Sequence, residues 1–215
     1  MSASDPIALA IVLALMALLP TVVVVSTSFL KIAIVMSLLR NALGVQQIPP
    51  NIALYGLALI LTVYVMAPVG YQIERELTAT PAAARDVGTL VATVRRGAEP
   101  LRSFMTRNAT PQQRDFFVHT ARKLWGPELA AALQATDFIV LVPAFMVSEL
   151  TRAFQVGFLL YLPFVVIDLI VSNILLAMGM MMVSPVTVSL PLKLFLFVMV
   201  DGWTRLIQGL VLSYA

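Results

Sequence analysis

The chain has 215 residues, of which 60% are hydrophobic and only 12% are charged, and its mean hydropathy is +0.94. Because soluble domains carry about 25% charged residues, this composition predicts an integral membrane protein. The net charge of +3 is small and the basic residues form no patch with interleaved aromatics, which argues against nucleic-acid binding. Cysteine is absent and His119 is the single histidine, so disulfides, thiol chemistry, a metal site and a cofactor are not expected.

The N-terminal segment from Ile7 to Leu30 is apolar and carries no charge. It is not typical of a secretory signal, because no Lys or Arg precedes it and Asp5 lies where the positive region would be. A helix needs about 20 apolar residues to cross a bilayer. We therefore expect a retained transmembrane segment, with a kink or break at Pro20.

A turn is expected next, because "NALGVQQIPPN" carries Gly44, Pro49 and Pro50. It follows a short amphipathic stretch, "KIAIVMSLLR", and precedes a second uncharged apolar segment, Ile52 to Gly70. Residues 1–70 are therefore predicted to form an N-terminal hydrophobic helical hairpin.

Residues 71–137 are far more polar, with 9 of the 14 basic and 7 of the 11 acidic residues. In "TPQQRDFF", Thr110 is a good N-cap and Pro111 a good first helical residue. We expect a soluble, mainly helical insert. The positive-inside rule is weak for loops longer than about 60 residues, so charge alone does not decide the side of the membrane on which the insert lies.

Residues 138–215 are predicted to form a second kinked hydrophobic hairpin. Pro143 and Pro163 suggest kinks in its first half. "SPVTVSLP", with Pro185 and Pro191, is expected to break the chain before a last amphipathic helix. A methionine-rich stretch at the tip contains Met178, Gly179, Met180, Met181 and Met182. Methionine fills irregular gaps and specifies a rigid core poorly, so this stretch suits a deformable surface, with ordinary packing as the alternative.

Charged residues interrupt this second block, and each costs at least about 2.5 kcal/mol at the centre of a bilayer. Two pairs are close enough along a helix to neutralise each other, and two residues must find partners across helices, across subunits or in water. An ion-pair network that locks helices or subunits together is favoured over a proton relay, because a relay needs a chain of titratable groups. The helical pairs are Glu149 with Arg152 and Asp201 with Arg205, and the two residues without a near partner are Asp168 and Lys193.

Four stretches of the chain form long, ordered motifs: "TSFLKIAIVMSLLRNALGVQQIPPN", "YVMAPV", "PAFMVSELTRAFQVGFLLYLPFVVIDLIVSNILLAMGMMM" and "SPVTVSLPLKLFLFVMVDGW". They resemble the FliP/SctR family of type III secretion export-apparatus proteins. The resemblance covers roughly residues 26–70 and 138–213, whereas residues 71–137 carry little of it. The sequence "RNALGVQQIPPN" looks more like the injectisome relatives YscR, HrcR and SpaP than the flagellar members of the family.

The resemblance implies a structural role without catalysis. Family members assemble as about five copies with SctS- and SctT-type partners into a helical, ring-like portal in the bacterial inner membrane. SctU- and SctV-type proteins then join, and unfolded effector proteins pass through. The complex projects on the periplasmic side, which would place residues 71–137 in the periplasm.

The resemblance also implies roles for particular residues. Met180, Met181 and Met182 would form a gasket at the pore constriction, with Met178 and Gly179 shaping its approach. Glu149 and Lys193 match positions at which the family forms ion pairs between subunits, and the network would extend through Arg152, Asp168, Asp201 and Arg205.

Two other classes of function fit the sequence less well. A small ion-coupled transporter using Asp168 and Glu149 would explain broken helices, but it leaves the methionine cluster without a role. A membrane enzyme has no nucleophile–base pair, metal spacing or phosphate loop in its support.

Overall fold

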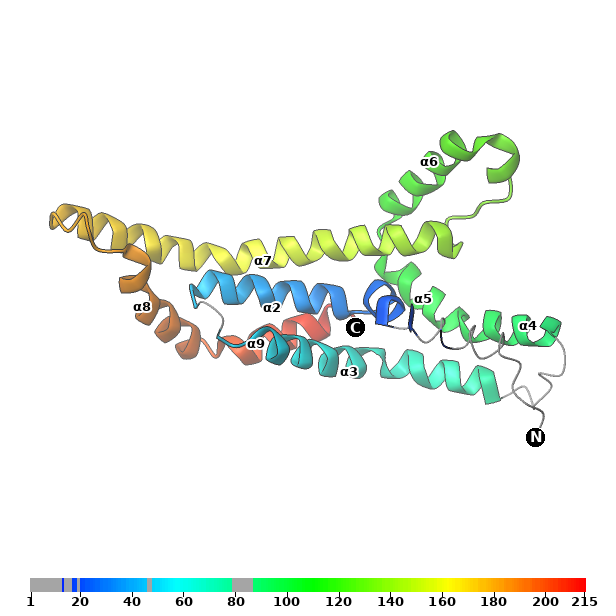
Figure 1. Ribbon diagram of the computed structural model, residues 1–215, viewed down its shortest axis with the longest axis horizontal. Helices are drawn as coiled ribbons and strands as arrows, with labels where there is room; N and C mark the ends of the chain where they lie inside the picture. The colour runs from blue at the N-terminus through cyan, green and yellow to red at the C-terminus, as the bar shows by residue number, and fades with distance from the viewer. Residues whose placement is uncertain (1–12, 14–16, 19, 46–47, 79–86) are drawn as a thin grey trace. The chain divides into compact units, whose positions relative to one another are not determined.

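The computed structural model of the protein describes residues 13, 17, 18, 20–45, 48–78 and 87–215. Throughout these residues the regular elements are helices, as Figure 1 shows, so the predicted all-α fold is confirmed for this part of the chain. The labelled helices are α2 (Phe29–Leu43), α3 (Asn51–Thr78), α4 (Val87–Gly97), α5 (Glu99–Asn108), α6 (Pro111–Ala130), α7 (Phe138–Ala177), α8 (Pro185–Met199) and α9 (Gly202–Leu212).

The chain divides into two compact units. Unit 1 comprises Met1–Leu30 and Pro68–Ser148, and unit 2 comprises Lys31–Ala67 and Glu149–Ala215. Both units therefore combine segments that lie far apart along the chain. The three-part division at residues 70 and 137 stays a prediction.

Two helices, α3 with 28 residues and α7 with 40, are long and apolar enough to cross a membrane. Within the described residues the number of candidate spans rises to four if each of two bent helix pairs counts as one span. At 1.5 Å per residue, α7 is about 60 Å long, roughly twice the hydrocarbon thickness of a bilayer. These helices agree with the predicted membrane-protein class.

The described part of the N-terminal segment bends at Thr27 and Ser28, between the helix Pro20–Ser26 and α2. Residues 17 and 18 are also helical and residue 19 lies outside the described residues, so the kink expected at Pro20 stays a prediction. The Ser26 hydroxyl donates to the Val22 carbonyl at 2.6 Å, and a side chain bonded back in this way competes with helical pairing. Most of the segment before Pro20 lies outside the described residues.

Helix α3 is longer than the predicted segment from Ile52 to Gly70, because it continues to Thr78. The added residues, "YQIERELT", contain the good helix formers Gln, Glu, Arg and Leu. The turn before α3 agrees with the prediction. In that turn the Arg40 guanidinium donates to the Pro49 carbonyl at 3.3 Å and to Asn51 Oδ1 at 2.5 Å.

The polar segment is helical, as predicted, and forms α4, α5 and α6. Thr110 is the N-cap of α6 and Pro111 its first residue, which confirms that prediction. The Thr110 N–H donates to Ser148 Oγ at 3.0 Å, and the Phe104 and Phe145 rings lie 5.8 Å apart. These contacts within unit 1 join α5 and the start of α6 to the first part of α7.

Helix α7 continues through Pro143 and Pro163, so neither proline ends the helix, and the kinks expected at the two positions stay predictions (Figure 1). Each proline removes one backbone hydrogen bond, and the residues on both sides keep a helical backbone. In unit 2 this helix packs closely on α2. A Cβ at Gly157 would collide with the Leu38 side chain, and Ile32, Val35 and Met36 of α2 are fully buried.

The expected break at "SPVTVSLP" is wrong, because these residues belong to the start of α8. Pro185 is the first helical residue, a position at which the missing N–H costs nothing, and the helix continues through Pro191. The break lies instead between α8 and α9, where the chain bends by 61°. Asp201 adopts a left-handed backbone there (φ 56°), and a Cβ at Gly202 would collide with the Phe197 ring.

Candidate functional site

One candidate site in unit 2 is a buried cluster of charges around Glu149, which is 0% exposed. Lys31 Nζ of α2 lies 3.6 Å from Glu149 Oε2, and Arg152 Nη1 of α7 lies 3.3 Å from Oε1. The Tyr214 hydroxyl donates to Oε2. We call these four residues the Glu149 cluster.

The Glu149 cluster is stabilised by more than Coulomb attraction. The Lys31 ammonium lies 3.5 Å from the centroid of the Tyr214 ring, which is a cation–π arrangement. A buried ion is costly unless charge and hydrogen-bond partners compensate for its lost hydration. Here Glu149 has two cations and a hydroxyl, and Lys31 has a carboxylate and an aromatic face. The cluster therefore joins α2, α7 and Tyr214, which follows α9.

A second ionic site joins α7 to α8. Lys193 Nζ lies 2.6 Å from Asp168 Oδ2, and the Ser189 hydroxyl donates to Asp168 Oδ1 at 2.5 Å. Lys193 also donates to the Ala42 carbonyl at 3.3 Å. Because Ala42 lies in the last turn of α2, the ammonium neutralises the negative end of that helix. We call Asp168, Ser189 and Lys193 the Asp168 site.

Asp201 and Arg205 do not form the side-chain pair that their spacing suggested. Within the described residues no ion pair joins them, and Asp201 Oδ1 instead accepts a hydrogen bond from Thr204 at 3.0 Å. Asp201 is the N-cap of α9 and has a left-handed backbone (φ 56°), and its carbonyl accepts the Arg205 N–H at 3.1 Å.

The other candidate site is the turn between α7 and α8, Met178–Met182, which we call the methionine turn. Gly179 has φ +74°, and its N–H donates to Leu176 O at 3.0 Å. The Met180 N–H donates to Leu175 O at 2.9 Å. These two bonds and the left-handed glycine make a Schellman motif, which ends α7 and fixes the direction in which the chain leaves it.

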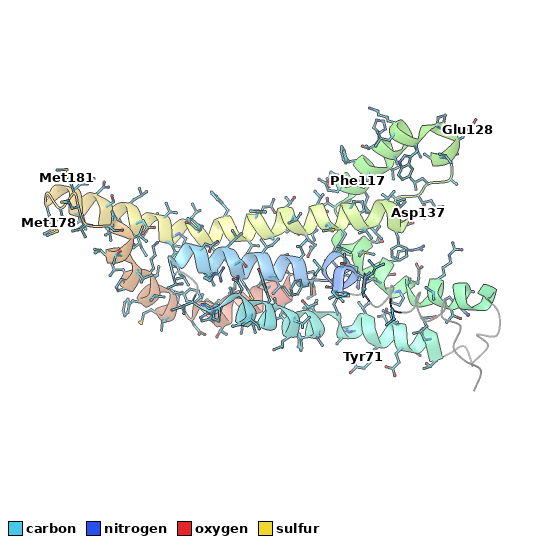
Figure 2. All side chains as sticks on the ribbon, in the orientation of Figure 1. Tyr71, Phe117, Glu128, Asp137, Met178 and Met181 are labelled. Atoms are coloured by element: carbon cyan, nitrogen blue, oxygen red, sulfur yellow. The ribbon has the colours of Figure 1, made fainter. Side chains whose placement is uncertain are left out.

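The side chains of the methionine turn are apolar and unpacked. Figure 2 shows Met178 and Met181 at the end of the α7–α8 hairpin, where the turn projects past the C-terminal end of α2. Met181 is 81% exposed and Met182 is 101% exposed, whereas Met36 in α2 is 0% exposed. Within the isolated chain, ordinary core packing does not explain the turn, because its side chains lie outside the core.

The structure thus brings together one pair that the sequence suggested, Glu149 with Arg152. It also joins Asp168 to Lys193, two residues for which the sequence named no particular partner. Sequence reasoning missed Lys31 and Tyr214. For Lys31, its position within an apolar helical stretch was a usable signal. Nothing in the local sequence marks Tyr214. Among the described residues no group of three or more His, Cys, Asp or Glu gathers to hold a metal ion.

Comparison with known proteins identifies the family. The FliP family pattern matches residues 12–210. The chain is 56% identical over 210 residues to "Yop proteins translocation protein R" of Yersinia pestis, covering 98% of this chain and 97% of the relative. It is 46% identical over 213 residues to "Harpin secretion protein HrcR" of Erwinia amylovora, with coverage of 98% and 97%. The chain therefore belongs to the FliP family, as its sequence motifs predicted.

Proposed function

We propose that this FliP-family chain is a core component of a type III secretion export apparatus. With partner subunits it forms a passage at the bacterial inner membrane for unfolded proteins, and the methionine turn closes that passage. The names of the relatives, which refer to translocation of Yop proteins and secretion of harpin, support an export role. They also favour the injectisome branch. The long apolar helices support a place in the membrane.

The observation that carries the proposal is the methionine turn. Its side chains are exposed and apolar, while its backbone is fixed by the Schellman motif at the end of a 40-residue helix. A ring of such side chains can close a pore by excluding water. Thioether side chains can also part for a polypeptide of any sequence, because they are unbranched and have no strong hydrogen bonds to satisfy.

Such a seal requires several copies around one axis. We propose about five copies, joined by SctS- and SctT-type partners and then by SctU- and SctV-type proteins, with the complex projecting into the periplasm together with residues 71–137. Glu149 and Lys193 already have partners within the chain, so they hold its helices in place. The more exposed members, Arg152 at 36% and Asp168 at 32%, are the parts of the two ionic sites that a neighbouring subunit reaches.

The alternative, an ion-coupled transporter using Asp168 and Glu149, has less support. A coupling carboxylate must exchange its proton or ion during transport, and each of these carboxylates is paired with a cation. Glu149 is also fully buried. The transporter predicts substrate-dependent proton flux by this chain alone, which a reconstituted preparation of the single chain would reveal.

Cysteine cross-linking tests the proposed seal directly, because the chain contains no cysteine. Met181→Cys would be co-expressed with the partner subunits, and the assembled complex oxidised. Copies of residue 181 around one axis would form disulfide-linked dimers, and a cysteine in a stalled export substrate would compete for the same thiol.

The matched control is Met199→Cys, since Met199 is also exposed, at 68%, but lies outside the turn. It should form fewer cross-links. If Met181→Cys stays monomeric in the assembled complex, the seal is not formed by this turn.

A further inference from the structure

The methionine turn has a chemical property that its proposed sealing role does not use. Four thioethers lie within five residues, and the exposed fractions of Met178, Met180, Met181 and Met182 are 63%, 43%, 81% and 101%. Susceptibility of methionine to two-electron oxidants follows exposure of the sulfur. The same chain holds buried methionines, Met36 and Met105, each at 0% exposure, as internal references.

We infer that the methionine turn is an oxidation-sensitive site, at which peroxide-class oxidants convert Met181 and Met182 to sulfoxides and thereby open the proposed seal to water. This inference rests on the proposed function for its consequence. The chemical selectivity itself rests only on the exposed fractions of the side chains.

The reaction is a single oxygen transfer. The Met181 thioether sulfur attacks one oxygen of hydrogen peroxide, the O–O bond breaks and an S–O bond forms. The second oxygen leaves as water after proton transfer. Sulfur loses two electrons, peroxide gains them, and methionine sulfoxide reductases reverse the change.

The geometry explains why the product would matter. An apolar constriction excludes ions because water does not wet it. A sulfoxide is polar and accepts hydrogen bonds, so an oxidised ring would hold water where the reduced ring excludes it. Hydrogen peroxide is small and carries no charge, so an apolar constriction excludes it less strongly than it excludes ions. Met199, 68% exposed at the end of α8, is an exposed methionine outside the turn whose oxidation should leave the seal intact.

The test uses the complex of the full chain with its partner subunits, in liposomes loaded with potassium ions and treated with increasing hydrogen peroxide. Peptide mass spectrometry measures oxidation at each methionine, and potassium efflux measures the leak. Oxidation of Met181 and Met182 should be clearly faster than that of Met36 and Met105. Efflux should rise together with oxidation of the turn.

The matched control replaces all four methionines of the turn by leucine, which is apolar, similar in volume and resistant to oxidation. Its efflux is compared before and after peroxide treatment, so that any change in basal sealing is subtracted, and no rise in efflux is expected. If Met181 and Met182 oxidise no faster than Met36 and Met105, the inference is overturned.

A further variant, Met181→Gln, separates the inference from the proposed function. If the turn oxidises without leak while Met181→Gln leaks, only the oxidation inference fails. If neither oxidation nor Met181→Gln causes a leak from assembled complexes, the proposed seal fails as well.

Discussion

The Glu149 cluster and the methionine turn, both in unit 2, are opposite solutions to placing unusual side chains on apolar helices. In the cluster, Glu149 is fully buried and held by two cations and a tyrosine hydroxyl. In the methionine turn, the Met182 side chain is fully exposed, and hydrogen bonds hold only the backbone of the turn. The Glu149 cluster holds its side chains in one geometry, whereas the exposed methionine side chains can adopt many. A seal that must yield to its cargo needs both, because deformable side chains close a pore only when their scaffold holds them in position.

The largest expected effect comes from Glu149→Ala. Removing this carboxylate leaves Lys31 buried beside Arg152 without its counter-ion, which should destabilise the fold by about 3–5 kcal/mol. The yield of assembled complex on native gels and the thermal unfolding midpoint in detergent measure this loss. A matched double variant, Glu149→Leu with Lys31→Met, removes both charges and should recover much of the stability. If the double variant is no more stable than Glu149→Ala, Lys31 and Glu149 do not act as a coupled pair.

The Asp168 site predicts an asymmetry between its two partners. Asp168→Ala leaves Lys193, which is 3% exposed, without its counter-ion, and should cost about 3 kcal/mol. Lys193→Met leaves Asp168, which is partly exposed and keeps its hydrogen bond from Ser189, so a smaller loss is expected. Thermal unfolding of the two variants side by side measures the difference. Equal losses, or a larger loss for Lys193→Met, would contradict the assigned burial.

A smaller effect is expected from Tyr214→Phe, which keeps the ring over Lys31 and removes the hydroxyl bound to Glu149. A hydrogen bond to a charged group contributes about 1.5–3 kcal/mol, so the unfolding midpoint should fall measurably. Tyr214→Leu removes the aromatic face as well, so its unfolding midpoint should fall further. An unchanged midpoint in Tyr214→Phe would mean that the end of the chain does not stabilise the cluster.

The smallest effect on stability is expected at Gly179. Gly179→Ala places a side chain at φ +74°, which costs about 1–2 kcal/mol and redirects the methionine turn. Open space surrounds Gly179, so a collision is not the cause. Gly179→Asn is the control, because asparagine tolerates this conformation better. Potassium efflux from liposomes should rise more for Gly179→Ala than for Gly179→Asn. Equal efflux would show that sealing does not depend on the backbone geometry of the turn.

The sequence predicted the all-α class and the N-cap of α6 because these depend on composition and neighbouring residues. Spacing along α7 also placed Glu149 beside Arg152. The partners Lys31 and Tyr214 were missed because they lie far from Glu149 along the chain, where periodicity carries no information. The break expected at "SPVTVSLP" was wrong because Pro185 suits the first turn of a helix, where the missing N–H has no helical partner to lose. Helix α7 continues through Pro143 and Pro163 although each removes a single hydrogen bond.

The most direct measurement of the central claim is potassium efflux through assembled complexes that carry Met181→Gln, in liposomes. Glutamine has a similar length and replaces the thioether by a hydrogen-bonding amide. Because Met181 is 81% exposed, assembly should match that of the unaltered chain. The account predicts normal assembly with raised efflux, since water would wet the constriction. Normal assembly with unchanged efflux would contradict it, because the methionine turn would then not form the seal.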